Sequence, residues 1–151
     1  MNKLQLQLFA EQLKTMRIGK KNGRPAPSKP ILMLSIIYCI STKDLQTNRI
    51  TFDNRLLQVT FLVLYGFYLN ALPEDDLPLF ICPFFHMSSE PFYELIWKEE
   101  TRPPLQTHTP SAKYLREHLA YAKLDDDLWT LLQEAENREY LRQVIIDRYM
   151  K

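Results

Sequence analysis

The sequence contains no apolar run that approaches the roughly 18 residues needed to span a bilayer. Its N-terminus, MNKLQLQLFAEQL, alternates leucine with glutamine and lacks the continuous apolar segment of a secretory signal. These two absences predict a cytoplasmic protein without a membrane segment. At 151 residues, with 46% hydrophobic and 25% charged residues, the chain suits one domain with a substantial core, and we expect residues 1–151 to form it.

Cysteine and histidine are scarce as well. The two cysteines, Cys39 and Cys82, show no CxxC spacing, and His86, His108 and His118 show no HxxxH spacing, so we expect no metal site. Because no secretory signal is present, reduced thiols are favoured over a disulfide between the two cysteines. We expect Cys39 to be a small buried hydrophobic residue.

Motifs of the common enzyme classes are missing. The chain has no GxSxG, no P-loop and no GxGxxG. Its acidic runs, PEDD, KEE and LDDD, are typical of helix caps and turns, where carboxylates are routine. These features favour a binding protein without a cofactor over an enzyme.

Positive charge is concentrated at one end of the chain. Residues 1–36 contain seven lysines and arginines against one acidic residue, Glu11, although the whole chain has a net charge of only +1. A basic end on a nearly neutral protein indicates a local contact with an anion. A solvated basic loop is the alternative that charge alone leaves open.

The first third of the chain predicts two helices joined by a loop. One helical face is formed by four apolar residues: Leu6, Phe9, Leu13 and Met16. This helix should end near Gly19, and residues 19–27 form a loop rich in glycine, proline and lysine. Ser28 is predicted to cap the next helix, about 29–40, with Pro30 in its first turn. That helix is apolar nearly all round and should cross the core.

The middle of the chain predicts a third helix and a β-hairpin. A short extended piece, 49–52, precedes Asp53, which is predicted to cap an apolar helix that continues to about Leu72. The segment PEDDLPL, 73–79, is predicted to be an exposed turn. The segment FFHMSSEPFYELIW, 84–97, is predicted to be a hairpin around a Ser-Ser-Glu-Pro turn, with most of its aromatic residues in the core.

The last third predicts more helix. A proline-rich loop, 102–110, leads to Ser111, which is predicted to cap a helix that carries Tyr114, Leu115 and His118. The segment LDDDLWTLLQEAENREYLRQVIIDRYM then predicts a short helix and a longer one. The expected class is α+β: a mainly helical domain with a small β element.

Three blocks of the sequence resemble a known family. They are AP-x-KP before an apolar run, PFFHMSS-x-x-F-x-x-L, and SAKYLREHLAYAKLDDDLWTLLQEAENREYLRQVII. Together these blocks look like the domain found ahead of HNH nuclease domains in modification-dependent, type IV restriction enzymes. This family includes the sulfur-binding domains that recognise phosphorothioated DNA. The resemblance covers about residues 20–151, and the HNH domain itself is absent from the sequence.

The resemblance implies a site at the start of the second helix. Lys29 corresponds to the cation that faces the modified phosphate, with Ser28 beside it, and Cys82, Pro83 and His86 correspond to the lining of an apolar cup for sulfur. Family members often have histidine or an aromatic residue in place of Ser28 and an aromatic residue in place of Cys82. The family's DGFW is replaced here by SEPFY.

Other cations and polar residues are weaker candidates. Lys20, Lys21 and Arg24 are predicted to follow the DNA backbone, with a solvated loop as the alternative. Three residues at the start of a helix are predicted to contact phosphate or a base edge, with simple helix capping as the alternative: His108, Ser111 and Lys113.

The sequence therefore favours a non-catalytic reader of phosphorothioate-modified double-stranded DNA, whose nuclease is a domain or partner supplied elsewhere. The alternatives are a reader of another DNA modification, a general DNA-binding module, and a protein-interaction domain whose basic loop meets an acidic partner. For the segment APSKP alone, a purely structural role in starting a core helix remains open.

Overall fold

The computed structural model describes residues 2–21, 24–69 and 76–151. Within these ranges the chain forms seven α-helices: α1 (Asn2–Lys14), α2 (Ser28–Ser41), α3 (Arg55–Leu69), α4 (Asp76–His86), α5 (Ala112–His118), α6 (Asp126–Leu131) and α7 (Ala135–Tyr149). It also forms a 3₁₀ turn, η1 (Met87–Ser89), and four strands: β1 (Lys20–Lys21), β2 (Arg24–Pro25), β3 (Tyr93–Trp97) and β4 (Leu119–Leu124). The predicted class, mainly helical α+β, is confirmed.

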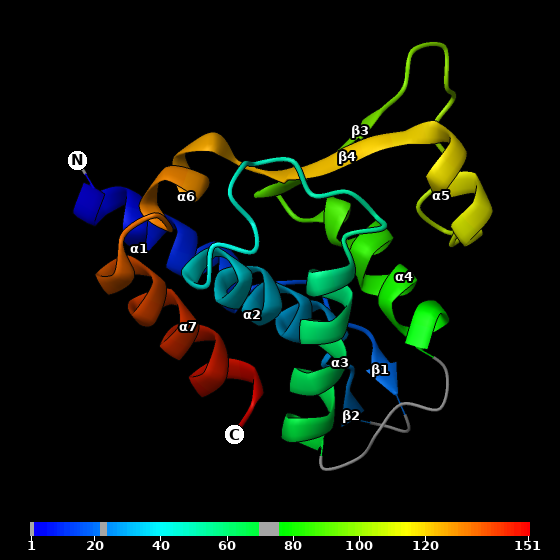
Figure 1. The fold of residues 1–151 in the computed structure, drawn as a ribbon. Coiled ribbons are helices and arrows are strands. Elements are labelled where there is room, and N and C mark those ends of the chain that lie inside the picture. Colours follow the sequence, from blue (N-terminus) through cyan, green and yellow to red (C-terminus); the bar gives the residue numbers. More distant parts are fainter. Residues whose placement is uncertain (1, 22–23, 70–75) are drawn as a thin grey trace.

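Helix α2 lies at the centre of the molecule (Figure 1) and packs against α3, α4 and α7. Its side chains are apolar all round, and Ile31, Leu32 and Ile36 are fully buried. Complete burial of such a side chain contributes about 1.5–3 kcal/mol. The prediction of a helix that crosses the core is confirmed, and Pro30 lies in its first turn as expected.

The predicted cap of α2 is wrong. The helix begins at Ser28 itself, and the capping position is held by Pro27, which has no side chain able to accept a hydrogen bond. The predicted cap of α3 is also displaced by one residue, because the Leu57 amide donates to Asn54 Oδ1 at 3.0 Å. Asp53 pairs instead with Arg116 at 2.9 Å. Helix α3 ends at Leu69, and the rest of its predicted length, 70–72, lies outside the described residues.

The predicted β-hairpin over 84–97 is wrong. Its first half belongs to α4 and η1, and only its second half, β3, is a strand. The first three residues of the predicted acidic turn, 73–75, lie outside the described residues, whereas Asp76 onward is helical. Helical spacing brings Phe80 and Phe84 to one face, with ring centroids 5.5 Å apart. Burial of these rings in the core outweighs the β-propensity of the aromatic residues.

The strand β3 pairs with β4 in an antiparallel ribbon, which crosses over the helices in Figure 1. The predicted extended piece before α3 joins this ribbon at one point, where Ile50 and Ala122 exchange two hydrogen bonds of 2.7 Å. Asn48 fixes the same region, because its side chain accepts from the Leu124 amide at 2.8 Å and donates to the Leu124 carbonyl at 2.7 Å. The sequence did not predict β4.

The C-terminal helices α6 and α7 are confirmed. Asp125 caps α6 through the amides of Asp127 and Leu128. Helix α7 is fastened to the confirmed N-terminal helix α1 by Tyr149, whose hydroxyl donates to the Leu13 carbonyl at 2.5 Å. None of the helices in the described part of the chain is long and apolar enough to cross a membrane.

Both cysteines are free thiols. Cys39 is buried, as predicted, and this burial raises the pKa of its thiol above the ordinary value. Cys82 is exposed. Among the residues that the structure describes, no group of three or more His, Cys, Asp and Glu side chains gathers as metal ligands do.

Candidate nucleic-acid interface

Lys29 lies in the first turn of α2 and is the centre of a polar cluster in which only Glu90 is buried. Its ammonium donates to the Arg17 carbonyl at 2.8 Å, to Ser89 Oγ at 2.9 Å and to Glu90 Oε2 at 2.9 Å. An ammonium has three N–H donors, so all of them are used inside the protein. The Lys29 side chain is only 12% exposed. Lys29, which was predicted to face the modified phosphate, therefore forms an ion pair with Glu90, a residue distant in the sequence.

Glu90 is the partner of Lys29 that sequence reasoning missed. Its side chain is 4% exposed, and its Oε2 accepts from the Arg17 amide at 2.8 Å as well as from Lys29. Removal of one partner from a buried pair leaves an uncompensated charge, which costs about 3–5 kcal/mol. The one signal in the sequence was the departure from the family pattern, which has DG where this chain has SEP.

His86 is the last residue of α4, and it lies close enough to Lys29 for the ammonium to affect its pKa. Burial lowers the pKa of His86 below its ordinary value, a bond with Gln106 opposes this change, and the nearby Lys29 ammonium adds to it. His86 Nε2 lies 2.7 Å from Thr109 Oγ1, and the imidazole packs edge-on against Phe85 with centroids 4.9 Å apart. The structure therefore brings together two of the residues that the resemblance assigned to one site.

Cys82 and Pro83 complete the predicted cup, but they differ in exposure. Cys82 is exposed and lies four residues before His86 on α4, a spacing that puts both side chains on one helical face. Pro83 is buried inside the helix. Of the three residues, only the Cys82 thiol and the half-buried His86 ring are therefore accessible from the surface.

A hollow of about 220 Å³ lies between η1, β3 and the proline-rich loop. Gln106 spans its edge, because its side chain donates to Ser88 Oγ. Nine residues line it, none of which was predicted to contribute to the site: Phe85, Ser88, Tyr93, Glu94, Leu95, Trp97, Pro103, Pro104 and Gln106.

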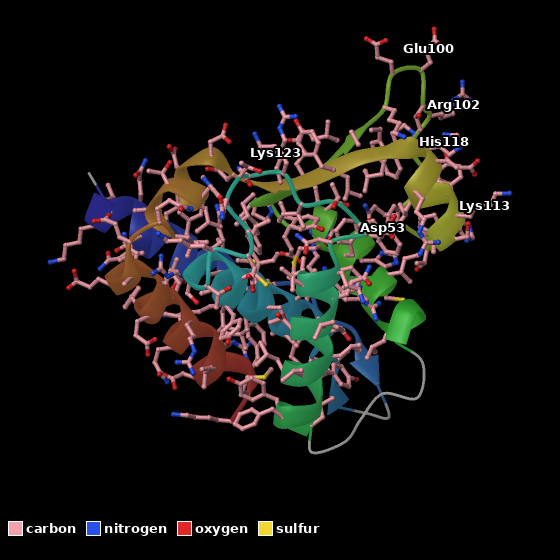
Figure 2. All side chains as sticks on the ribbon, viewed as in Figure 1. Asp53, Glu100, Arg102, Lys113, His118 and Lys123 are labelled. Atoms are coloured by element: carbon pink, nitrogen blue, oxygen red, sulfur yellow. The ribbon has the colours of Figure 1, made fainter. Side chains whose placement is uncertain are left out.

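The remaining candidates are spread around this centre. Ser111 caps α5 by accepting from the Tyr114 amide at 3.1 Å, which is its simple structural role. His108 is exposed in the loop before it. Figure 2 shows Lys113 pointing outward from α5, at the same end of the molecule as Arg102.

The basic residues Lys20, Lys21 and Arg24 lie on β1 and β2, two paired strands of two residues each that precede α2. Their backbones pair as Lys20 with Pro25 and Lys21 with Arg24. The Ala26 amide closes the hairpin on the Gly19 carbonyl at 2.8 Å. The side chains of these three cations lie outside the described part of the structure, so their predicted contact with the DNA backbone stays a prediction.

The fold has clear counterparts among solved structures. The sulfur-binding domain of ScoMcrA, solved in complex with phosphorothioated DNA, superposes with a TM-score of 0.70 over 93% of this chain and 86% of that chain, at 19% identity. The chain has the fold of that domain. A structure of the sulfur-binding and SRA domains of ScoMcrA with phosphorothioated DNA gives a TM-score of 0.72 at 20% identity. The type IV phosphorothioation-dependent restriction endonuclease ScoMcrA gives 0.69 at 19% identity.

The chain spans 42% of the two-domain ScoMcrA chain and 29% of the endonuclease chain, in each case with 93% of its own length. No protein-family model matches the sequence, and no curated protein matches it significantly.

Proposed function

We propose that this domain reads double-stranded DNA in which a phosphorothioate replaces a backbone phosphate, and that it catalyses no reaction of its own. The observation that carries the proposal is the fold match over 93% of the chain to a domain that was solved with phosphorothioated DNA. Cleavage of the DNA, where it occurs, is the task of a nuclease domain or partner outside these 151 residues.

Discrimination must come from the one atom that differs between the two ligands. Sulfur is larger and more polarizable than oxygen and accepts hydrogen bonds less strongly, so it gains more from dispersion contacts and loses less on leaving water. A phosphate oxygen in an apolar recess is a desolvated acceptor without a donor, which costs about 1–3 kcal/mol. Selectivity therefore rests largely on a penalty against the unmodified linkage.

The exposed face of Cys82 and the ring of His86 supply the apolar surface for sulfur in this proposal. Pro83 lies behind them and, lacking an N–H, cannot rescue an oxygen. His86 has a lowered pKa, so the neutral imidazole is favoured at pH 7 and adds no charge that would attract an oxygen.

Anchoring of the charged backbone is assigned to other groups. The N-terminal end of α2, a 14-residue helix, has the partial positive charge and free amides that suit a phosphate. We propose that Lys20, Lys21 and Arg24 hold the flanking phosphates, while Lys29 shapes the site through Glu90 and does not contact DNA directly.

Binding to two matched duplexes, one with a single phosphorothioate and one without, tests the proposal by fluorescence anisotropy at several salt concentrations. The oxygen penalty predicts a preference for the thioated duplex of about 5- to 150-fold. Equal binding with a steep salt dependence would instead identify a general DNA-binding module, and no binding to either duplex would favour a protein-interaction domain.

A single substitution tests the cup itself. Cys82→Ser places a hydroxyl donor where a phosphate oxygen needs one, so we expect tighter binding to the plain duplex and a smaller preference. The control is Thr42→Ser, just beyond the C-terminal end of α2 and about 20 Å from the start of that helix. A Cys82→Ser protein that retains the full preference contradicts the assignment of the cup.

A further inference from the structure

A second pocket lies between α3 and α5, apart from the site at Lys29. Its volume is about 250 Å³. Seven residues line it: Asp53, Arg55, Gln58, Val59, Leu62, Phe80 and Arg116. We call it the α3–α5 pocket. Its size is slightly below the 300–1,000 Å³ or so that is usual for ligand sites, which limits it to a small occupant.

The wall that α3 contributes changes character along its length. Arg55, Gln58 and Leu62 follow helical spacing and face the pocket together with Val59. From Arg55 to Leu62 this stripe is about 10 Å long. One end is therefore charged and lies at the positive N-terminal end of a 15-residue helix, and the other end is apolar and backed by the Phe80 ring.

The charged end retains donors that no described residue uses. Arg116 donates through Nε to Asp53 Oδ1 at 2.9 Å, and its guanidinium lies 5.6 Å from the centroid of the Phe52 ring. The two terminal nitrogens of Arg116 have no hydrogen-bond partner within the described ranges, and Arg55 has no ion-pair partner there either. Two guanidinium groups against one carboxylate leave the pocket with a net positive charge, which suits an anion.

Gln58 gives the middle of the pocket an unused acceptor. Its side chain is about nine-tenths buried, and its Nε2 donates to the Phe52 carbonyl at 2.7 Å. Its Oε1 accepts no hydrogen bond from any described residue and faces the pocket that Gln58 lines. An acceptor without a described partner at the pocket surface can accept an N–H or O–H from the occupant.

We propose that the α3–α5 pocket binds a single nucleotide. Its phosphate would lie between Arg55 and Arg116, where planar guanidinium groups match phosphate geometry. An N–H on the base edge would donate to Gln58 Oε1, and the base ring would lie against Val59, Leu62 and the edge of Phe80. A simple inorganic anion satisfies only the first of these three features, and an apolar ligand satisfies only the last.

Nuclear magnetic resonance of the full 151-residue chain, labelled with ¹⁵N, tests the proposal. The probes are dAMP, dGMP, dCMP and TMP, with inorganic phosphate and adenosine as matched half-ligands. We expect at least one nucleotide to shift the Gln58 side-chain amide and the Arg55 and Arg116 Nε signals in a saturable way, with at least tenfold tighter binding than either half-ligand. Unchanged signals, or phosphate that binds as tightly as every nucleotide, overturn the proposal.

Exposed arginines provide the variants, because their replacement leaves the core intact. Arg55→Gln should weaken nucleotide binding at least fivefold, whereas Arg142→Gln, on the surface of α7, should leave it unchanged. Equal affinity of the two variants refutes the assignment.

A plain duplex with one unpaired nucleotide, compared with a fully paired one, distinguishes a nucleotide of a strand from a free nucleotide. Signals that move only with the fully paired duplex count against the pocket. These ligands contain no sulfur, so the outcome is independent of the proposed reading of phosphorothioate.

Discussion

The ion pair between Lys29 and Glu90 should dominate the local energetics of the candidate site. Glu90→Leu leaves the Lys29 ammonium, which is 12% exposed, with two neutral acceptors and no counter-charge. Lys29→Met leaves the Glu90 carboxylate, which is 4% exposed, with the Arg17 amide as its main donor. We expect each single variant to lower the free energy of unfolding by about 3–5 kcal/mol.

The double variant should lose much less than the sum of the two single losses. Replacement of a buried pair by apolar side chains of similar size is often neutral, because both desolvation penalties disappear together. We therefore expect a coupling free energy of at least about 2 kcal/mol in a double-mutant cycle. Urea unfolding of the four proteins measures it. Single losses below about 1 kcal/mol that simply add would refute the reasoning.

The same variants separate a structural lysine from one that contacts DNA. A lysine that neutralises a phosphate contributes about 0.9 to the slope of the logarithm of the binding constant against the logarithm of salt concentration. The Lys29 ammonium donates all three of its hydrogen bonds to protein acceptors. We therefore expect the Lys29→Met, Glu90→Leu double variant to retain the wild-type slope. A slope reduced by about 0.9 would show that the ammonium turns toward the DNA on binding.

Three further predictions concern titration and capping. Because the pKa of His86 is lowered in the folded protein, its contribution to stability is complete above about pH 6.5 and is lost as the pH falls through the native pKa. An NMR titration of His86 should therefore give a midpoint below about 6.5. This midpoint should rise when Lys29 is replaced, because the ammonium lowers the pKa. Burial raises the pKa of Tyr93 well above its usual value, so the free energy of unfolding should fall above about pH 10. In urea titrations, Tyr93→Phe should remove this alkaline loss. The variant also loses the hydrogen bond from the Tyr93 hydroxyl to the Phe84 carbonyl. Asn54→Ala should lower the free energy of unfolding by about 1 kcal/mol, because it removes the cap of α3. Asp53→Ala breaks only an exposed ion pair and should lower it by less. If thermal melts show the reverse order, Asn54 is not the cap.

The sequence predicted the helices whose apolar residues follow one helical face or fill every face, such as α1 and α2. It failed at 84–97, where a dense run of aromatic residues satisfies both a strand and a helix. Only the packing of Phe80 and Phe84 against residues from other segments, Phe52 and Phe61, decides for the helix. Local propensity contains no information about those distant partners.

The site shows the same limit. The resemblance assigned Lys29 and His86 to one site, and the Lys29 ammonium lies near enough to lower the pKa of His86, while their contact with DNA stays a prediction. The role of Lys29 could not be predicted, because its partner Glu90 lies 61 residues away and the contact exists only after η1 has formed. Pro83 was expected at the surface of the cup, yet helical packing buries it. Such errors arise wherever burial depends on contacts between distant segments.

The hydrogen bonds of Asn48 and Ile50 to β4 hold the β3–β4 ribbon in place independently of the loop that joins its two strands. Because the ribbon is fastened near its root, the long connection from Lys98 to Pro110 can accept insertions and substitutions without disturbing the helices. Gln106 and Thr109 lie on this connection and touch the candidate site. Under the proposed function, changes in this one exposed connection would alter the preference for neighbouring bases, while Cys82 and His86, the proposed contacts of the sulfur, stay unchanged.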